Sequence, residues 1–310
     1  MTKVKFQSFW EKFGTLCILI CMFIAFSIAS PEFFPQPTNL LQCLLQSTVY
    51  IFLAFGEFFA ILLGGIDLSV GSVACFSGII VAEMALKGIN PVICVLVGLV
   101  GAAVLGVING WLINVLDLHP FVVTLGTNTI FRGVCLVITG GNPVFNLPPW
   151  VKSLSTYVWV IPKPVIYAAV FGLILIFFTV RTVPGRNLFA LGGNKQSAWY
   201  SGINTKRYTL LAHTLSSLLA GMGGIIMLAR IGAAEPTAGD GYETYAIAAC
   251  IIGGASLFGG KGKIVGVTIG TINNGLNIMN VSSFWQKIVM GLLIIGSVAL
   301  EKFVSNQAKK

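Results

Sequence analysis

Four ionisable side chains stand inside or beside long apolar runs of this sequence: Glu57, Asp67, Glu83 and Arg132. A charged side chain is costly in lipid, so such residues face a protein interior or an aqueous cavity and often mark the path of a solute or proton. A buried arginine needs a partner, and Glu57 is one candidate partner for Arg132. Glu83 has Lys87 four residues later, which favours an ordinary ion pair on a helix surface.

Asp67 stands in the stretch GGIDLSVG, between two apolar runs. Gly64 and Gly65 end the first run, and Asp67 precedes the second by three residues, as a helix cap would. Its carboxylate could accept the backbone N–H groups of Ser69 or Val70, which hydrocarbon cannot satisfy. Two interpretations remain open: a structural cap at a hinge near an inner gate, or a bent segment that lines or gates a transport path.

Two stripes of small residues each lead into side-chain amides. Small residues at every fourth position let another helix approach closely, and they occur at Gly98, Ala102, Gly106 and Gly110, and again at Gly262, Gly266 and Gly270. The amides need partners from neighbouring helices or from water in a cavity; they are Asn109, Asn114, Asn273, Asn274 and Asn277. Close helix packing is one interpretation, and an aqueous path beside these helices is the other.

The sequence gives little support for a catalytic site or a metal site. The stretch GGASLFGGKGK, residues 253–263, is similar to a phosphate loop, but Gly262 stands where that loop has Ser or Thr. The seven cysteines lie in apolar runs without a C-x-x-C pattern, and there are only two histidines. We therefore predict no catalytic residue, no metal site and no bound cofactor in this chain.

The elements that must position these residues are membrane helices. Of the 310 residues, 56% are hydrophobic and 9% are charged, which is typical of a polytopic membrane protein. A helix needs roughly 20 apolar residues to cross a bilayer. We predict one all-α transmembrane domain over residues 1–310 with about ten spans, near 15–30, 41–63, 70–86, 91–115, 121–139, 165–180, 208–231, 245–258, 264–279 and 286–304.

The basic residues predict the orientation of these spans. They gather before the first span, after the last and in the segment 181–207, so the positive-inside rule places both termini and that segment in the cytoplasm. The loops 64–69, 116–120 and 259–263 share that side, whereas 140–164 and 232–244 lie outside. The first run is interpreted as a retained span, although Ser27-Ile28-Ala29 also resembles a signal-peptide cleavage site. The net charge of +9 is a topology signal, and no nucleic-acid partner is predicted.

The segment 181–207 is the longest predicted cytoplasmic loop. Within it, Leu188 to Ser201 could form a short helix along the membrane surface. That helix is either part of a solvated tether or a docking site for a cytoplasmic partner protein.

Three longer stretches resemble one family, the membrane permeases of bacterial monosaccharide ABC importers of the ribose, xylose, galactose and allose class. The stretches are GGIDLSVGS (64–72), PGRNLFALGGN followed by SGIN (184–204), and EPTAGDGYETYAIAACIIGGASLFGGKGKIVGVTIG (235–270). The resemblance is closest to ribose-type permeases. Relatives usually differ from this chain at Ser197, at Thr244-Tyr245 and at Glu57-Phe58, which bears on the sugar and on the lining of the path.

The resemblance implies an inner-membrane permease that moves a monosaccharide into the cytoplasm by alternating access. It implies three partners: a cytoplasmic ABC ATPase that uses ATP and Mg, a periplasmic or lipid-anchored sugar-binding protein, and a second permease copy. It assigns a periplasmic mouth to Thr237, Tyr242 and Glu243. It assigns the ATPase-coupling loop to Gly185, Arg186, Ala190, Gly192, Asn194, Ala198, Ser201 and Gly202.

The candidate residues of the translocation path or gate come from the residue analysis itself: Glu57, Asp67, Asn109, Arg132, Asn273, Asn274 and Asn277. An alternative function is a secondary transporter of a small polar solute, coupled to protons through Glu57, Asp67 and Arg132. A passive channel or membrane scaffold is a third class.

Overall fold

The computed structural model describes residues 30–32 and 34–264, with residues 24, 27, 28, 288, 291, 292 and 295. The predicted spans 15–30, 264–279 and 286–304 therefore lie almost entirely outside the described residues. So do Asn273, Asn274 and Asn277.

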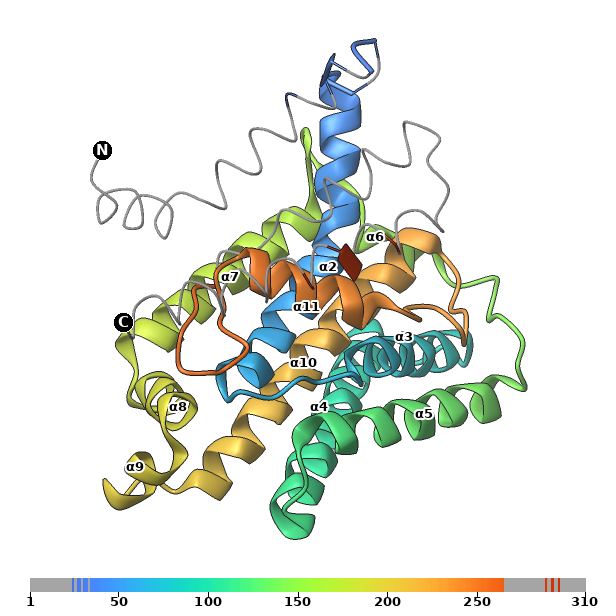
Figure 1. The fold of residues 1–310 in the computed structure, drawn as a ribbon. Coiled ribbons are helices and arrows are strands. Elements are labelled where there is room, and N and C mark those ends of the chain that lie inside the picture. Colours follow the sequence, from blue (N-terminus) through green and yellow to red (C-terminus); the bar gives the residue numbers. More distant parts are fainter. Residues whose placement is uncertain are drawn as a thin grey trace.

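Seven apolar helices account for the predicted spans between residues 41 and 258 (Figure 1). Five are long and apolar enough to cross a membrane, and α3 and α11 are shorter. The number of spans in the whole chain stays a prediction. The helices are α2 (Pro37–Leu62), α3 (Val70–Leu86), α4 (Pro91–Leu116), α5 (Pro120–Thr139), α7 (Lys163–Arg181), α10 (Thr205–Ile231) and α11 (Tyr242–Ile252).

Local sequence explains where most helices begin and end. Proline occupies the start of α4 and α5, and the preceding Asn90 and His119 side chains accept backbone N–H groups of the first turn. Gly232 ends α10 with a φ of 76°. The predicted span 245–258 is too long at its C-terminal end, because Gly253 ends α11 and Gly254 turns the chain with a φ of 87°.

Shorter elements lie between the apolar helices. The predicted outer loop 140–164 contains α6 (Pro149–Ser153) and a hairpin of β1 (Tyr157–Val158) and β2 (Ile161–Pro162), neither of which was predicted. The predicted short helix at 188–201 is two helices, α8 (Val183–Gly193) and α9 (Lys195–Tyr200). Asn194 separates them and caps α9, since its Oδ1 accepts the Ser197 N–H at 2.8 Å.

Helix α10 is the centre of the bundle and packs against α2, α3 and α4 (Figure 1). Backbones approach closely at these contacts. A Cβ at Gly106 of α4 would lie 2.4 Å from the His213 carbonyl oxygen, and one at Gly56 of α2 would lie 2.5 Å from that of Ser216. The interpretation of the α4 stripe as a close-packing surface is therefore confirmed. Helices α4, α5 and α7 leave most of their apolar side chains exposed, as expected for helices facing lipid.

The loops gather at two opposite ends of the bundle. At one end the Gly260 N–H donates to the Leu62 carbonyl at 2.9 Å, beside Gly192. At the other, Val144 and Ala234 form an antiparallel bridge. This grouping agrees with the predicted order of loops along the chain, and which end faces the cytoplasm stays a prediction.

Gly224 of α10 should be the glycine whose replacement damages this packing most clearly. A Cβ there would lie 1.9 Å from the Ala74 carbonyl oxygen, so Gly224→Ala should force the two helices apart and lower stability by about 1–3 kcal/mol. Gly126→Ala is the matched control, because no atom of another described helix lies within 4 Å of its Cβ position. Thermal unfolding in detergent measures the stability of both variants. Equal unfolding midpoints for the two variants would contradict the close approach of α10 to α3 at Gly224.

Candidate functional site

The segment 63–69 leaves α2 and turns back into the bundle. Gly64, with a φ of 76°, makes the reversal possible, and the Asp67 N–H then donates to Glu57 Oε1 at 3.0 Å. Asp67 and Ser69 have no exposed surface. The predicted cytoplasmic loop at 64–69 is not a solvent-exposed loop: no residue of the segment is exposed, because helices surround it, and its side of the membrane stays a prediction.

The segment reaches well inside the helix ends. Its partners Glu57, Asn109, Thr124 and Ser216 lie about one to three helical turns from the nearest ends of α2, α4, α5 and α10. Helix α3 consequently begins inside the bundle, which explains why it is short.

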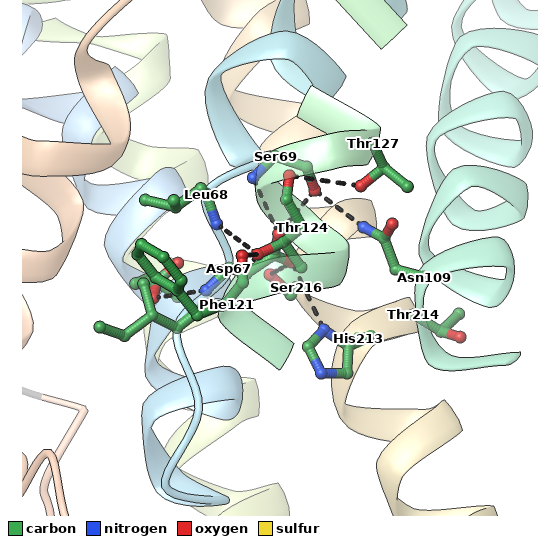
Figure 2. Close-up of polar contacts among 12 residues, drawn as sticks. Asp67, Leu68, Ser69, Asn109, Phe121, Thr124, Thr127, His213, Thr214 and Ser216 are labelled. Atoms are coloured by element: carbon green, nitrogen blue, oxygen red, sulfur yellow. Dashed lines mark hydrogen bonds and ion pairs between the residues drawn. The ribbon is translucent and has the colours of Figure 1, made fainter. Parts of the chain in front are cut away.

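Asp67 binds both the start of α3 and the middle of α10. Its Oδ1 accepts the Ser69 N–H at 3.0 Å and the Ser69 hydroxyl at 2.6 Å, so the predicted bond to Ser69 forms, although Ser69 rather than Asp67 is the N-cap of α3. Its Oδ2 accepts the Ser216 hydroxyl at 2.8 Å and lies 3.6 Å from His213 Nδ1. Figure 2 shows these side chains pointing toward one another.

Sequence reasoning missed His213 and Ser216. Both lie in the apolar run 208–231, and both are buried. A histidine three residues before a serine pair in such a run is itself a signal of a buried polar contact. The contact could not be assigned to Asp67 from the sequence, since the two segments are far apart in the chain.

Thr124 of α5 satisfies the backbone of the segment directly. Its hydroxyl accepts the Leu68 N–H at 3.1 Å and donates to the Ile66 carbonyl at 3.0 Å. Asn109 of α4 donates its amide to the Ser69 hydroxyl at 2.8 Å. Side chains of α2 and α5, together with Asp67 itself, thus replace backbone hydrogen bonds that a regular helix would supply, and Asn109 and Ser216 bind the side chains of Ser69 and Asp67.

Among the described residues, two buried oxygens of this network, Glu57 Oε2 and Asn109 Oδ1, have no hydrogen-bond partner, and His213 Nδ1 has only its 3.6 Å contact with Asp67 Oδ2. A partly satisfied polar network is costly in a protein interior. The network therefore keeps unused capacity to bind a hydroxyl, a water or a proton at the middle of the bundle.

Arg132 belongs to a second group of residues, next to the first turn of α3. Its Nη1 donates to the carbonyls of Pro236 and Ala238 at 3.2 and 2.6 Å. The suggested Arg132–Glu57 pair does not form, because backbone carbonyls satisfy the arginine and Glu57 binds the Asp67 N–H. Glu83 and Lys87 likewise form no ion pair.

The predicted mouth residues lie in the same second group. The backbone oxygen of Gly239 and the carboxylate of Glu243 both lie against Gly71, in the first turn of α3. Tyr242 packs on Tyr50 with ring centroids 4.9 Å apart. Thr237 donates its hydroxyl to Glu235. Residues 235–243 therefore reach the start of α3 from the side opposite to segment 63–69.

The predicted coupling residues lie on α8, on α9 and in the turn that follows. Arg186, Ala190, Asn194, Ser201 and Gly202 are exposed, whereas Gly185 and Ala198 are buried. Gly192 packs against α2, because a Cβ there would lie 1.7 Å from the Leu62 oxygen. Helix α8 is thus in direct contact with Leu62, the last residue of α2 before segment 63–69.

Comparison with known proteins assigns the chain to a family. The family described as "Branched-chain amino acid transport system / permease component" matches residues 39–298. The chain belongs to this family. As one of its permeases it is a multi-pass inner-membrane protein and no enzyme, and ATP hydrolysis lies in a separate subunit.

Several relatives are similar over nearly the whole permease. It is 49% identical to the D-allose transport system permease protein AlsC of Escherichia coli, over 97% of its own length and 94% of that protein. It is 41% identical to the ribose import permease protein RbsC of Bacillus subtilis, over 97% and 95% of the two chains. It is 36% identical to the RbsC protein of Escherichia coli, over 93% and 92%. No solved structure matches. The resemblance to monosaccharide ABC importer permeases is confirmed.

Replacing Thr124 by valine should destabilise the permease, because two buried backbone groups lose their partner while the side-chain shape is kept. We expect a loss of about 1–3 kcal/mol, measured as a lower thermal midpoint in detergent. Thr124→Ser should restore most of it. Thr129→Val is the control, since the Thr129 hydroxyl donates to the carbonyl of its own helix on an exposed face. Equal effects of the two valine substitutions would refute the role of Thr124.

Asp67→Asn should keep most transport if hydrogen bonding is the role of Asp67. Asparagine retains one acceptor for Ser69, and its NH₂ group faces Ser216 and His213, where either partner can accept. Asp67→Leu should abolish folding or transport, because it leaves the buried donors unpaired. Uptake and thermal stability are measured together. A stable Asp67→Asn permease with severely reduced uptake would show that the charge itself is used.

Proposed function

We propose that this permease imports a monosaccharide, D-allose or a ribose-like pentose, as the membrane subunit of an ABC importer. The identity of 49% with a D-allose permease over nearly the full length carries this proposal, and the ribose permeases follow at 41% and 36%. A cytoplasmic ATPase using ATP and Mg supplies the energy, a sugar-binding protein delivers the substrate, and two permease copies form the path.

The geometry around the first turn of α3 supports alternating access. Segment 63–69 approaches this turn from one end of the bundle, and residues 235–243 approach it from the other. Because the two segments meet at the same turn, a small shift of either one opens the protein toward its own side. Glu57, Asp67 and Asn109 form the gate on one side, and Arg132, Thr237, Tyr242 and Glu243 belong to the other.

The contact between α8 and α2 supports the coupling role of residues 181–207. The exposed residues of α8 and α9 offer a surface for the ATPase, and Gly192 transmits its movement to Leu62. Segment 63–69 begins immediately after Leu62, so a displacement of α8 reaches Asp67 within a few residues. The ATPase thereby shifts the equilibrium between outward and inward states.

Proton coupling through Glu57, Asp67 and Arg132 has less support. Arg132 contacts backbone carbonyls and not the acids, so the three residues do not form one relay. Uptake that depended on a pH gradient and did not depend on ATP would nevertheless support this alternative.

Sugar-dependent ATP hydrolysis tests the proposal. The permease is reconstituted in liposomes with its ATPase and binding protein, and D-allose, D-ribose, D-glucose and leucine are compared. We expect stimulation by D-allose or D-ribose only. Stimulation by leucine alone would overturn the sugar assignment.

The same assay tests coupling through α8. Arg186 is exposed and forms no ion pair with a described carboxylate, so Arg186→Glu should leave folding intact and uncouple hydrolysis from uptake. Lys152→Glu is the matched control at the opposite end of the bundle. It should leave ATP hydrolysis and uptake unchanged. Normal ATP-driven uptake by Arg186→Glu would contradict the coupling role.

A further inference from the structure

An open groove lies between the C-terminal end of α4 and the N-terminal end of α10, away from the polar network. Its volume is about 610 Å³, within the range of roughly 300–1,000 Å³ that small-ligand sites occupy. The groove is lined by Trp111, Asn114, Val115, Asn204, Lys206, Arg207 and Leu210. Asn204, Lys206 and Arg207 belong to the C-terminal end of the segment 181–207, but none of the lining residues is among the named coupling or gate residues.

One wall of the groove is cationic. Lys206 and Arg207 are exposed, and neither forms an ion pair with a carboxylate in the part of the chain that the structure describes. Both stand in the first turn of α10, where the helix dipole is already positive. The positive charges of Lys206 and Arg207 are repelled by the positive end of the helix dipole and by each other. An anion bound between them would reduce this repulsion.

The backbone beneath these cations is held in place. Asn204 accepts the Arg207 N–H at 3.0 Å, and Asn114 of α4 donates its amide to the Lys206 carbonyl at 2.8 Å. The cationic turn is therefore fixed against α4 rather than free to move away from it. The anion site is preorganised, which lowers the cost of binding.

The other wall is apolar and continues the lipid-facing surface of α4. Trp111 is 56% exposed and Val115 is 58% exposed, and Val104, Val107 and Ile108 lie exposed on the preceding turns. A tryptophan near the end of a membrane helix is typical of the level of the lipid head groups. A ligand that fills this groove thus needs an anionic head and an apolar body.

We propose that the groove binds an anionic phospholipid, with its phosphate on Lys206 and Arg207 and an acyl chain along Trp111 and Val115. Basic pockets between membrane helices are suited to such head groups. A soluble phosphate compound would use the two cations and leave the apolar wall bare. The site requires membrane insertion and does not depend on which sugar is transported.

Lipid binding to the full-length permease in phosphatidylcholine nanodiscs tests the site. Phosphatidylglycerol should raise the thermal midpoint of the unmodified protein, and the double variant Lys206→Gln/Arg207→Gln should bind it about 30-fold more weakly, from about 1 kcal/mol per cation. The matched control is Arg186→Gln/Lys195→Gln, which removes two exposed cations of α8 and α9. Its response to phosphatidylglycerol should equal that of the unmodified protein.

Two results would overturn the proposal: equal responses from both double variants, or the same stabilisation by glycerol phosphate as by the lipid. If the groove variant does not fold, Trp111 emission in the unmodified protein still decides. The emission of Trp111 is the difference between the spectra of the unmodified protein and of the Trp111→Phe variant. Brominated phosphatidylglycerol should quench this emission more strongly than brominated phosphatidylcholine does. Equal quenching by the two lipids would refute a site selective for anionic head groups.

Discussion

Every backbone N–H and C=O group that leaves a helix inside a membrane protein needs a partner, and this constraint governs residues 63–69. Leu63, Gly64 and Gly65 still donate to carbonyls of α2, but the backbone N–H groups of residues 67–69 bind side-chain oxygens instead of helix carbonyls. Glu57, Thr124 and Asp67 supply the missing donors and acceptors. The carboxylate that first looked misplaced in an apolar run therefore allows irregular backbone to exist at that depth.

This arrangement in turn depends on close packing around α10. Glycines in α2, α4 and α10 bring backbones near enough for Ser216, His213 and Asn109 to reach the segment. Larger side chains at the contacts would separate the helices and break the polar network. The small residues and the polar residues thus depend on each other, since the hydrogen bonds form only at short interhelical distance.

The same contacts give a physical account of transport. The network is buried, and some of its polar atoms have no hydrogen-bond partner among the residues that the structure describes. Its segment starts at Leu62, where α8 is packed, and ends at the turn of α3 that residues 235–243 also contact. One short stretch thereby connects the proposed ATPase surface, the gate and the opposite loop.

The sequence by itself determined the membrane class, the resemblance to the family, most helix boundaries from residue 37 to 252, the small-residue stripe of α4 and the hydrogen bond from Ser69 to Asp67. The family follows from long motifs that resemble known permeases, and the other features follow from composition, periodicity and contacts over a few residues, all of which are local. Only the tertiary structure decided that 63–69 is buried, that His213 and Ser216 meet Asp67, and that Arg132 binds carbonyls of the 235–241 loop instead of Glu57. Those contacts join segments up to about 150 residues apart, and hydropathy encodes how apolar a run is but not which neighbours surround it.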